Sequence, residues 1–405
     1  MRLGTPGFVA SRLKEARDAR GISTLISLAD LLQVDTSTVS RWESGQSAPS
    51  PETLIELATL LRVRPSYFLR APFKHGKGPI FFRSLASARK QDQARQRARL
   101  RWVQDLSVVI QHYVDFPPVE IPDLLGGTSY RQLRDEDIER IAVGLRKHWK
   151  LGDQPVTNVL EVLERSGFVV AADEMGTTAL DGLCHWSEHD GRPYIMLATD
   201  KMSFFRRQMD AAHEMAHAIL HRRVTEEGLR ADFEIIEQQA FRLASAFLMP
   251  ASSFSMAVGA NPTLSNLLSQ KDRMRVSVKA MIRRCRDLKL ISTEDERQLY
   301  KYYSGKGWTR EEPLDRLVPI ARPRLLANAL GMIVSEGVRS KEGLLANEFT
   351  IPARDIEDLL GLDSGWFSRG LGQVVQLRSE RDNRTLSSVA GAEVVAFRPR
   401  RSWGE

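Results

Sequence analysis

The chain of 405 residues contains only two cysteines, Cys184 and Cys285, which lie far apart. They have neither the spacing of a redox pair nor that of a zinc cluster, so we expect reduced thiols in a cytoplasmic protein. The sequence also lacks an apolar run of about eighteen residues, the length that a transmembrane helix needs. Its N-terminus has no apolar segment of the secretory type. We therefore expect no membrane partner.

Charge is unevenly distributed along the chain. The hydrophobic content of 42% and the charged content of 27% are typical of a globular protein that is long enough for several domains. The net charge is +7, and residues 71–105 hold nine Lys or Arg against two Asp or Glu. Such a basic segment suits phosphate contact, and an ordinary solvated helix face is the alternative.

Residues 209–222 contain the motif His213-Glu214-x-x-His217 in a stretch with helical apolar spacing. On a helix, positions i and i+4 share one face, so both imidazoles can reach a single Zn²⁺ ion. Zinc hydrolysis needs a third protein ligand and an open position for water, and Glu214 is placed to take that water's proton. A chance occurrence of the motif is the alternative.

The third zinc ligand is expected on a second helix, over residues 234–249, which Pro250 ends. One carboxylate, Glu237, heads the apolar stripe of this helix, and burying a charged group is costly unless a cation meets it. We therefore predict Glu237 as the third ligand, with Glu234 as the competitor. An exposed carboxylate at the start of a helix is the alternative interpretation.

These segments resemble the ImmA/IrrE family of metallopeptidases. The resemblance rests on His213-Glu-Met-Ala-His-Ala-Ile-Leu-His221, on Glu237-x-x-Ala240 and on Leu248-Met-Pro250. Phe241 and Leu243 depart from the Asn and Phe that are usual in the second helix. The resemblance implies a site-specific zinc protease that cleaves a repressor.

Residues 8–70 show short stretches of helical spacing separated by turn signals, with Asp35 as a predicted N-cap. Ser-Thr-Val-Ser-Arg-Trp-Glu-Ser-Gly, residues 37–45, resembles the XRE (Cro/cI-like) helix-turn-helix family. Val39 and Trp42 should then face the core. The side chains expected to face double-stranded DNA are Thr36, Ser37, Ser40 and Arg41.

One departure from that family lies at the start of the second helix. Thr24 and Leu25 stand where a phosphate-contacting Gln is usual. Loss of that contact would weaken DNA binding, and a helix-turn-helix used only for protein interaction is the alternative.

Residues 183–197 predict a hairpin with a turn at Asp190-Gly191. Residues 194–197 are our predicted exposed strand edge, where a substrate backbone could pair beside the zinc. Three further histidines could donate to an oxyanion, although each also suits a structural role: His185, His189 and His221.

The expected fold is mainly α with a small β-sheet (α+β). We predict a helix-turn-helix domain at 1–72, a basic helical connector at 73–118, a zincin-like metallopeptidase domain at 119–250 and a helical domain at 251–405. The last domain should end in a strand pair, at 373–378 and 393–398, and could sense a ligand, bind a partner or dimerise.

Two functions follow from these motifs. The first is a DNA-binding zinc endopeptidase and transcriptional regulator that hydrolyses a peptide bond in a partner protein, expected to be a repressor. The second is a regulator or antitoxin that uses the peptidase fold as a sensor and cuts little or nothing. Both act at operator DNA, and a homodimer is expected because many helix-turn-helix proteins bind half-sites as dimers.

Overall fold

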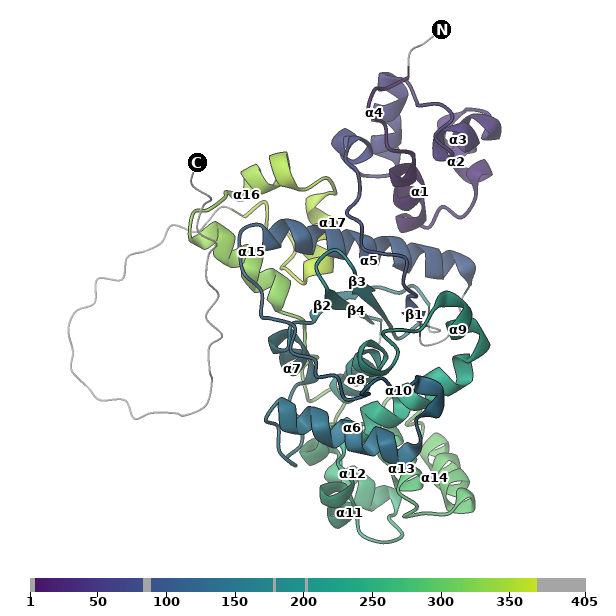
Figure 1. The fold of residues 1–405 in the computed structure, drawn as a ribbon, viewed down its shortest axis with the longest axis vertical. Coiled ribbons are helices and arrows are strands. Elements are labelled where there is room, and N and C mark those ends of the chain that lie inside the picture. Colours follow the sequence, from purple (N-terminus) through teal and green to yellow (C-terminus); the bar gives the residue numbers. More distant parts are fainter. Residues whose placement is uncertain (1–3, 83–88, 178–179, 201–202, 370–405) are drawn as a thin grey trace, which may run out of the picture.

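The structure is a computed structural model that describes residues 4–82, 89–177, 180–200 and 203–369 (Figure 1). It confirms the predicted fold class, since helices dominate and surround one small mixed sheet. The predicted strand pair at 373–378 and 393–398 lies outside the described residues. Among the described residues, no single helix is both long and apolar enough to cross a membrane, although α10 (Phe233–Leu248) and α11 (Ala251–Val258) pass that test as a pair bent by 71°.

Residues 10–69 form a bundle of short helices. Its elements are α1 (Ala10–Ala19), α2 (Leu25–Leu32), α3 (Thr36–Glu43), α4 (Pro51–Leu60) and the 3-10 helix η1 (Pro65–Leu69). Val39 and Trp42 of α3 are buried, as predicted. Thr24, which departs from the family pattern, caps α2 because its hydroxyl accepts the Ser27 N–H at 3.0 Å.

The long helix α5 (Lys90–Gln111) lies at the centre of the molecule rather than in an exposed linker (Figure 1). It packs against α1, α17, β4 (Arg192–Ala198) and α15 (Leu325–Ser335). Asp355 of α17 (Ala353–Leu360) accepts from Arg20, at the C-cap of α1, at 2.8 Å and from Arg99 of α5 at 3.1 Å. Burial favours a higher pKa for Asp355, but the two guanidinium groups outweigh it and lower the pKa. These partly buried ion pairs tie the N-terminal bundle to the rest of the protein.

The sheet has the strand order β1-β3-β4-β2. Its strands are β1 (Phe81–Phe82), β2 (Val169–Asp173), β3 (Gly182–Ser187) and β4 (Arg192–Ala198). The hairpin prediction is confirmed, because β3 and β4 pair antiparallel across a turn in which Gly191 has a φ of 65°. The predicted exposed edge at residues 194–197 is wrong, since β4 lies between β3 and the parallel strand β2.

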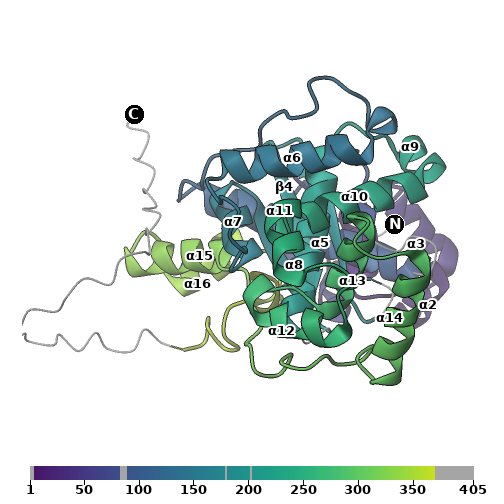
Figure 2. The same ribbon diagram turned by 90° about the horizontal axis from the view of Figure 1, so that it is seen from below.

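The two faces of the sheet bury two separate hydrophobic cores. On one face, Leu183 and Met196 share a core with α5, the N-terminal bundle, α15 and α17. On the other face, Cys184 and Ile195 share a core with α6, α7, α8 and α10 (Figure 2). The bounds of these helices are α6 (Asp135–His148), α7 (Val159–Arg165), α8 (Phe204–Leu220), α10 (Phe233–Leu248) and α15 (Leu325–Ser335).

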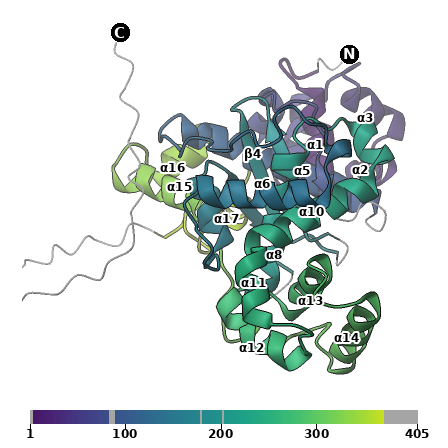
Figure 3. The same cartoon turned by 60° about the horizontal axis from the view of Figure 1, so that its bottom comes forward.

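Four further helices extend the second core away from the N-terminal bundle (Figure 3). They are α11 (Ala251–Val258), α12 (Leu264–Met274), α13 (Val278–Asp287) and α14 (Thr293–Gly305). The remaining short elements are η2 (Tyr130–Gln132), α9 (Glu226–Ala231), α16 (Lys341–Gly343) and the π-helical turn η3 (Leu344–Glu348). The helix after Pro250 thus shares its core with α8 and α10.

Candidate metal centre

The helix α8 carries the histidine motif and is buried along most of its length. Its first turn is capped by Ser203, whose hydroxyl accepts the Arg206 N–H at 3.3 Å. His213, Glu214 and His217 are each fully buried between the sheet and α10, which packs across α8. The sequence therefore places three ionisable side chains inside a core, where an uncompensated charge is costly.

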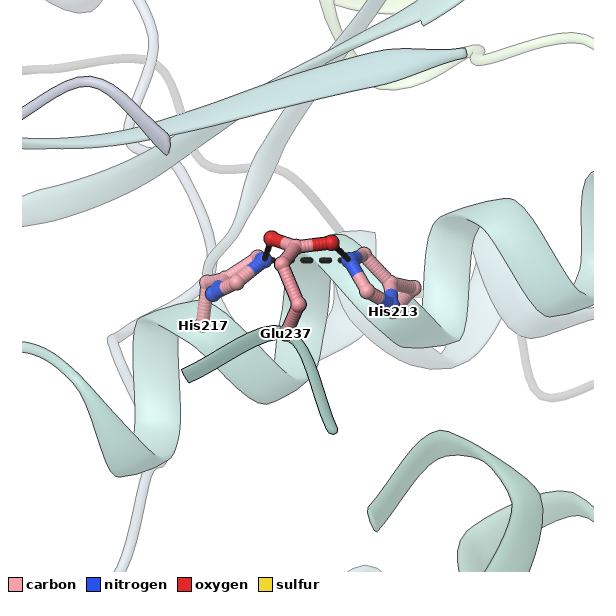
Figure 4. Close-up of side chains that lie close together, drawn as sticks. All are labelled: His213, His217 and Glu237. Carbon is pink, nitrogen blue, oxygen red and sulfur yellow. Dashed lines mark hydrogen bonds and ion pairs between the residues drawn. The ribbon is translucent and has the colours of Figure 1, made fainter. Parts of the chain in front are cut away.

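The structure brings the three predicted ligands together (Figure 4). The Nε2 atoms of His213 and His217 lie 3.0 Å apart. The carboxylate of Glu237 spans both, with one oxygen 3.2 Å from the His217 Nε2 and the other 3.4 Å from the His213 Nε2. The competitor Glu234 is exposed on the outside of α10. Within the described part of the chain, this is the only such group that could hold a metal ion.

Glu214 lies against β3 rather than among the three ligands. A Cβ atom added to Gly182 of β3 would stand 2.8 Å from a Glu214 oxygen, so a larger residue there would displace the Glu214 side chain. Burial raises the pKa of the neighbouring Cys184 thiol, and the charge of Glu214 raises it further. The carboxylate of Glu214 therefore lies in a narrow buried space between α8 and the sheet.

A chain of polar contacts runs from His217 to the backbone of η2. Gln239 donates its Nε2 to the Tyr130 carbonyl at 2.6 Å, so its oxygen faces the His221 Nε2, 3.1 Å away. Burial, followed by the nearby His217, lowers the pKa of His221 to about 3, so its ring is neutral and has one N–H. That N–H is at Nε2, which makes the His221 Nδ1 the acceptor for the His217 Nδ1–H, 3.1 Å away. The Nε2 lone pair of His217 is thereby left facing the centre.

The other two histidines considered as oxyanion donors are engaged elsewhere. His185 contacts Gln104 of α5 at 2.9 Å, on the opposite face of the sheet from α8. Burial, followed by the nearby His75, lowers the pKa of His185 to about 4. The ring of His189 packs on Phe73, with ring centroids 4.9 Å apart. Neither residue joins the metal-capable cluster.

A cavity of about 340 Å³ opens beside the His213 end of the centre. Met209 of α8 lines it one turn before His213, and Phe241 of α10 lines it with its ring 4.4 Å from the His213 ring. Phe241, which departs from the family's usual Asn, thus packs directly on a predicted ligand. Lys279 and Arg283 of α13 line the far side of the cavity. The cavity therefore reaches Phe241, whose ring contacts His213.

The predicted DNA-facing residues share one exposed surface of α3: Thr36, Ser37, Ser40 and Arg41. The Arg41 guanidinium donates to the Thr38 hydroxyl at 3.2 Å and is otherwise presented at the surface. Hydroxyl and guanidinium groups arranged in this way suit contacts to base edges and phosphates.

The sequence did not predict the contacts that three residues make at the centre. Gln239 and His221 form the contact chain behind His217, and Phe81 of β1 stacks on the His217 ring with centroids 4.7 Å apart and planes at 11°. The sequence offered His221 as an oxyanion donor or a structural residue, not as a partner of His217. Phe81 lies in a two-residue strand far from the motif, so its position has no periodic signal.

Comparison with known families matches two separate parts of the chain. The profile described as helix-turn-helix matches residues 13–68, and the profile described as IrrE N-terminal-like domain matches residues 163–286. Both predicted resemblances are thereby confirmed. A comparison with curated proteins found no match. The second match continues through α13, past residue 250, and the predicted boundary there stays a prediction.

Proposed function

Because the chain joins a DNA-binding helix-turn-helix domain to an IrrE N-terminal-like domain, we propose that it is a DNA-binding zinc endopeptidase that regulates transcription. The observation that carries this proposal is the convergence of two buried imidazole nitrogens and one carboxylate on a single point. His213, His217 and Glu237 would hold the zinc ion.

The spacing of the donor atoms supports zinc as the metal. Zinc–nitrogen and zinc–oxygen bonds of about 2.0–2.2 Å at tetrahedral angles separate two ligand atoms by about 3.3 Å. The corresponding separations here are 3.0, 3.2 and 3.4 Å. Two nitrogens and one carboxylate are also a ligand set of catalytic zinc, since three protein ligands leave one position open.

Peptide hydrolysis would depend on Glu214 as the acid and base. Zinc, when bound, supplies Lewis acidity that polarises the scissile carbonyl and lowers the pKa of water to about 7. Glu214 takes the proton of the attacking water and returns it to the leaving amine. Its burial between α8 and Gly182 holds the carboxylate in one place and limits its exposure to bulk water.

The helix-turn-helix domain would bring the peptidase to operator DNA. Thr36, Ser37, Ser40 and Arg41 would contact operator DNA, with two copies of the chain on the two half-sites. The protein substrate would be a repressor, met at the operator or recognised through the N-terminal bundle. A protein that binds operator DNA in this way would act in the cytoplasm.

The experiment compares Glu214→Gln with the matched change Glu227→Gln, on the exposed surface of α9. Each zinc-loaded protein is incubated with the helix-turn-helix repressor encoded nearest to its own gene, and the products are identified by mass spectrometry. We expect the wild type and Glu227→Gln to cut the repressor, and Glu214→Gln to bind zinc but not cut. Cleavage by Glu214→Gln at the wild-type rate would contradict the role of Glu214.

One observation favours the second function, a regulator that senses rather than cuts. The ring of Phe81 covers His217, so the centre is partly closed by the chain itself. Tight, zinc-dependent DNA binding together with no cleavage of the repressor would favour this alternative. Loss of cleavage on adding a chelator, with DNA binding unchanged, would favour the endopeptidase.

A further inference from the structure

The edge of the sheet beside the metal centre is occupied by a segment from outside the metallopeptidase fold. β1 lies between the N-terminal bundle and α5 in the sequence, and it pairs antiparallel with β3. Phe81 stands opposite Cys184, and Phe82 stands opposite Leu183. An extended peptide that adds to the edge of a sheet makes the same kind of backbone pairing.

The side chain of Phe81 fills a small apolar pocket next to His217. Its partners are Val224, which follows α8, Leu229 of α9 and Ile236 of α10. Phe81 is 3% exposed, and this cluster is separate from the two large cores of the protein. One face of the Phe81 ring lies flat on the imidazole of a predicted zinc ligand. The pocket is therefore shaped for an aromatic ring that arrives on a strand.

Phe82 points to the other side of the sheet. It belongs to the core around α5, with the Arg97 guanidinium 5.9 Å from its ring centroid. The two phenylalanines alternate as neighbours on a strand do, so β1 directs a single side chain at the centre. That makes Phe82 a matched control for Phe81.

We propose that this pocket is the subsite for an aromatic side chain of an extended peptide, and that Phe81 occupies it as an internal pseudosubstrate. The inference rests on the metallopeptidase function proposed above. A partner peptide must displace β1, pair with β3 in its place and insert its own aromatic ring against His217. Because the internal segment is tethered, its effective concentration is about millimolar, and a peptide at micromolar concentration cannot compete with it.

The test measures binding of a fluorescein-labelled peptide with the sequence of residues 75–82 by fluorescence anisotropy. The full-length, zinc-loaded protein carries Glu214→Gln, so that no peptide is consumed. We expect Phe81→Ala to bind this peptide at least tenfold more tightly than the parent, because its pocket is empty. Phe82→Ala should bind it as weakly as the parent, and a peptide whose own Phe81 is replaced by Ala should not bind to any of the three proteins.

Equal peptide binding by Phe81→Ala and the parent, with zinc content and circular dichroism unchanged, would overturn the inference. If Phe81→Ala fails to fold, a cross-strand disulfide gives a second test. The double variant Phe82→Cys/Leu183→Cys keeps Phe81 and locks β1 onto β3 when oxidised. With protein titrated to millimolar concentration, where the reduced form binds measurably, the oxidised form should bind the peptide at least tenfold more weakly. Equal measurable binding by the two forms would also overturn the inference.

These results separate the inference from the function on which it rests. If Phe81→Ala gains peptide binding while the protein that keeps Glu214 cuts no repressor, the endopeptidase is refuted and the aromatic subsite stays in place. If the protein cuts the repressor but Phe81→Ala gains no peptide binding, the aromatic subsite is refuted and the endopeptidase stays in place.

Discussion

The Nδ1 atoms of His217 and His221 lie 3.1 Å apart, and Gln239 holds His221 from the opposite side at the same distance. This chain fixes the tautomer in which the Nε2 lone pair of His217 faces the centre. Ligands that are oriented in this way bind metal more tightly than ligands that are free to rotate or to change tautomer.

Gln239→Leu should therefore weaken zinc binding by about 10–100-fold, the range that is usual for partners of metal ligands. The leucine removes the acceptor for His221 while keeping a side chain of similar size. The zinc dissociation constant is measured by competition with a chromophoric chelator. Gln238→Leu, an exposed change at the neighbouring position, is the control. Equal affinities in the two variants would show that the chain does not orient His217.

Glu164 of α7 should make stability depend on pH. It accepts the N–H groups of Arg324 and Leu325 at 2.8 and 2.9 Å, yet burial outweighs these bonds and raises its pKa from 4.5 to about 7. Between these two values the unfolded chain has released a proton that the folded chain keeps. The free energy of unfolding should therefore fall by about 3 kcal/mol as the pH rises through this window.

Glu164→Gln should remove that part of the pH dependence, because the amide keeps an acceptor oxygen and cannot ionise. The melting temperature is recorded from pH 4.5 to pH 8 for this variant, for the wild type and for the exposed Glu227→Gln. We expect the stabilisation of Glu164→Gln over the wild type to appear only at the upper end of the range. A constant difference at every pH would contradict the raised pKa.

Arg41 should contribute to DNA binding through a phosphate or a base edge. Arg41→Ala is expected to weaken operator binding and, if the contact is to phosphate, to reduce the slope of log K against log salt by about one. Arg273→Ala, on the exposed surface of α12, removes the same charge at a site far along the chain. Binding is measured by gel shift at several salt concentrations. Equal effects of the two changes would exclude α3 as the DNA-contacting helix.

The convergence of His213, His217 and Glu237 could be predicted because each position follows from local spacing. His213 and His217 are four residues apart on one helix, and Glu237 is the buried carboxylate at the head of a second apolar stripe. Such patterns survive folding, since a helix fixes which side chains share a face. The exposed residues of α3 were predictable for the same reason.

The sheet edge could not be predicted, because strand order depends on contacts between distant segments. Residues 194–197 have the pattern of a strand, but this pattern does not indicate which strands pair with it. In the structure β2 pairs on one side and β3 on the other. β1 has only two residues, too few for an alternating pattern, and it pairs with β3 about a hundred positions further along the chain. The roles of His221 and Gln239 likewise depend on how α8 meets α10.

The most direct test of the central claim is the zinc content of the purified full-length chain, measured by inductively coupled plasma mass spectrometry after loading and dialysis. We predict one zinc ion per chain in the wild type and in Glu214→Gln, and loss of that zinc in His213→Ala/His217→Ala and in Glu237→Ala. Glu234→Ala, which changes the exposed competitor on α10, should keep it. A wild-type chain without zinc, or a double histidine variant that retains it, would contradict the proposed centre.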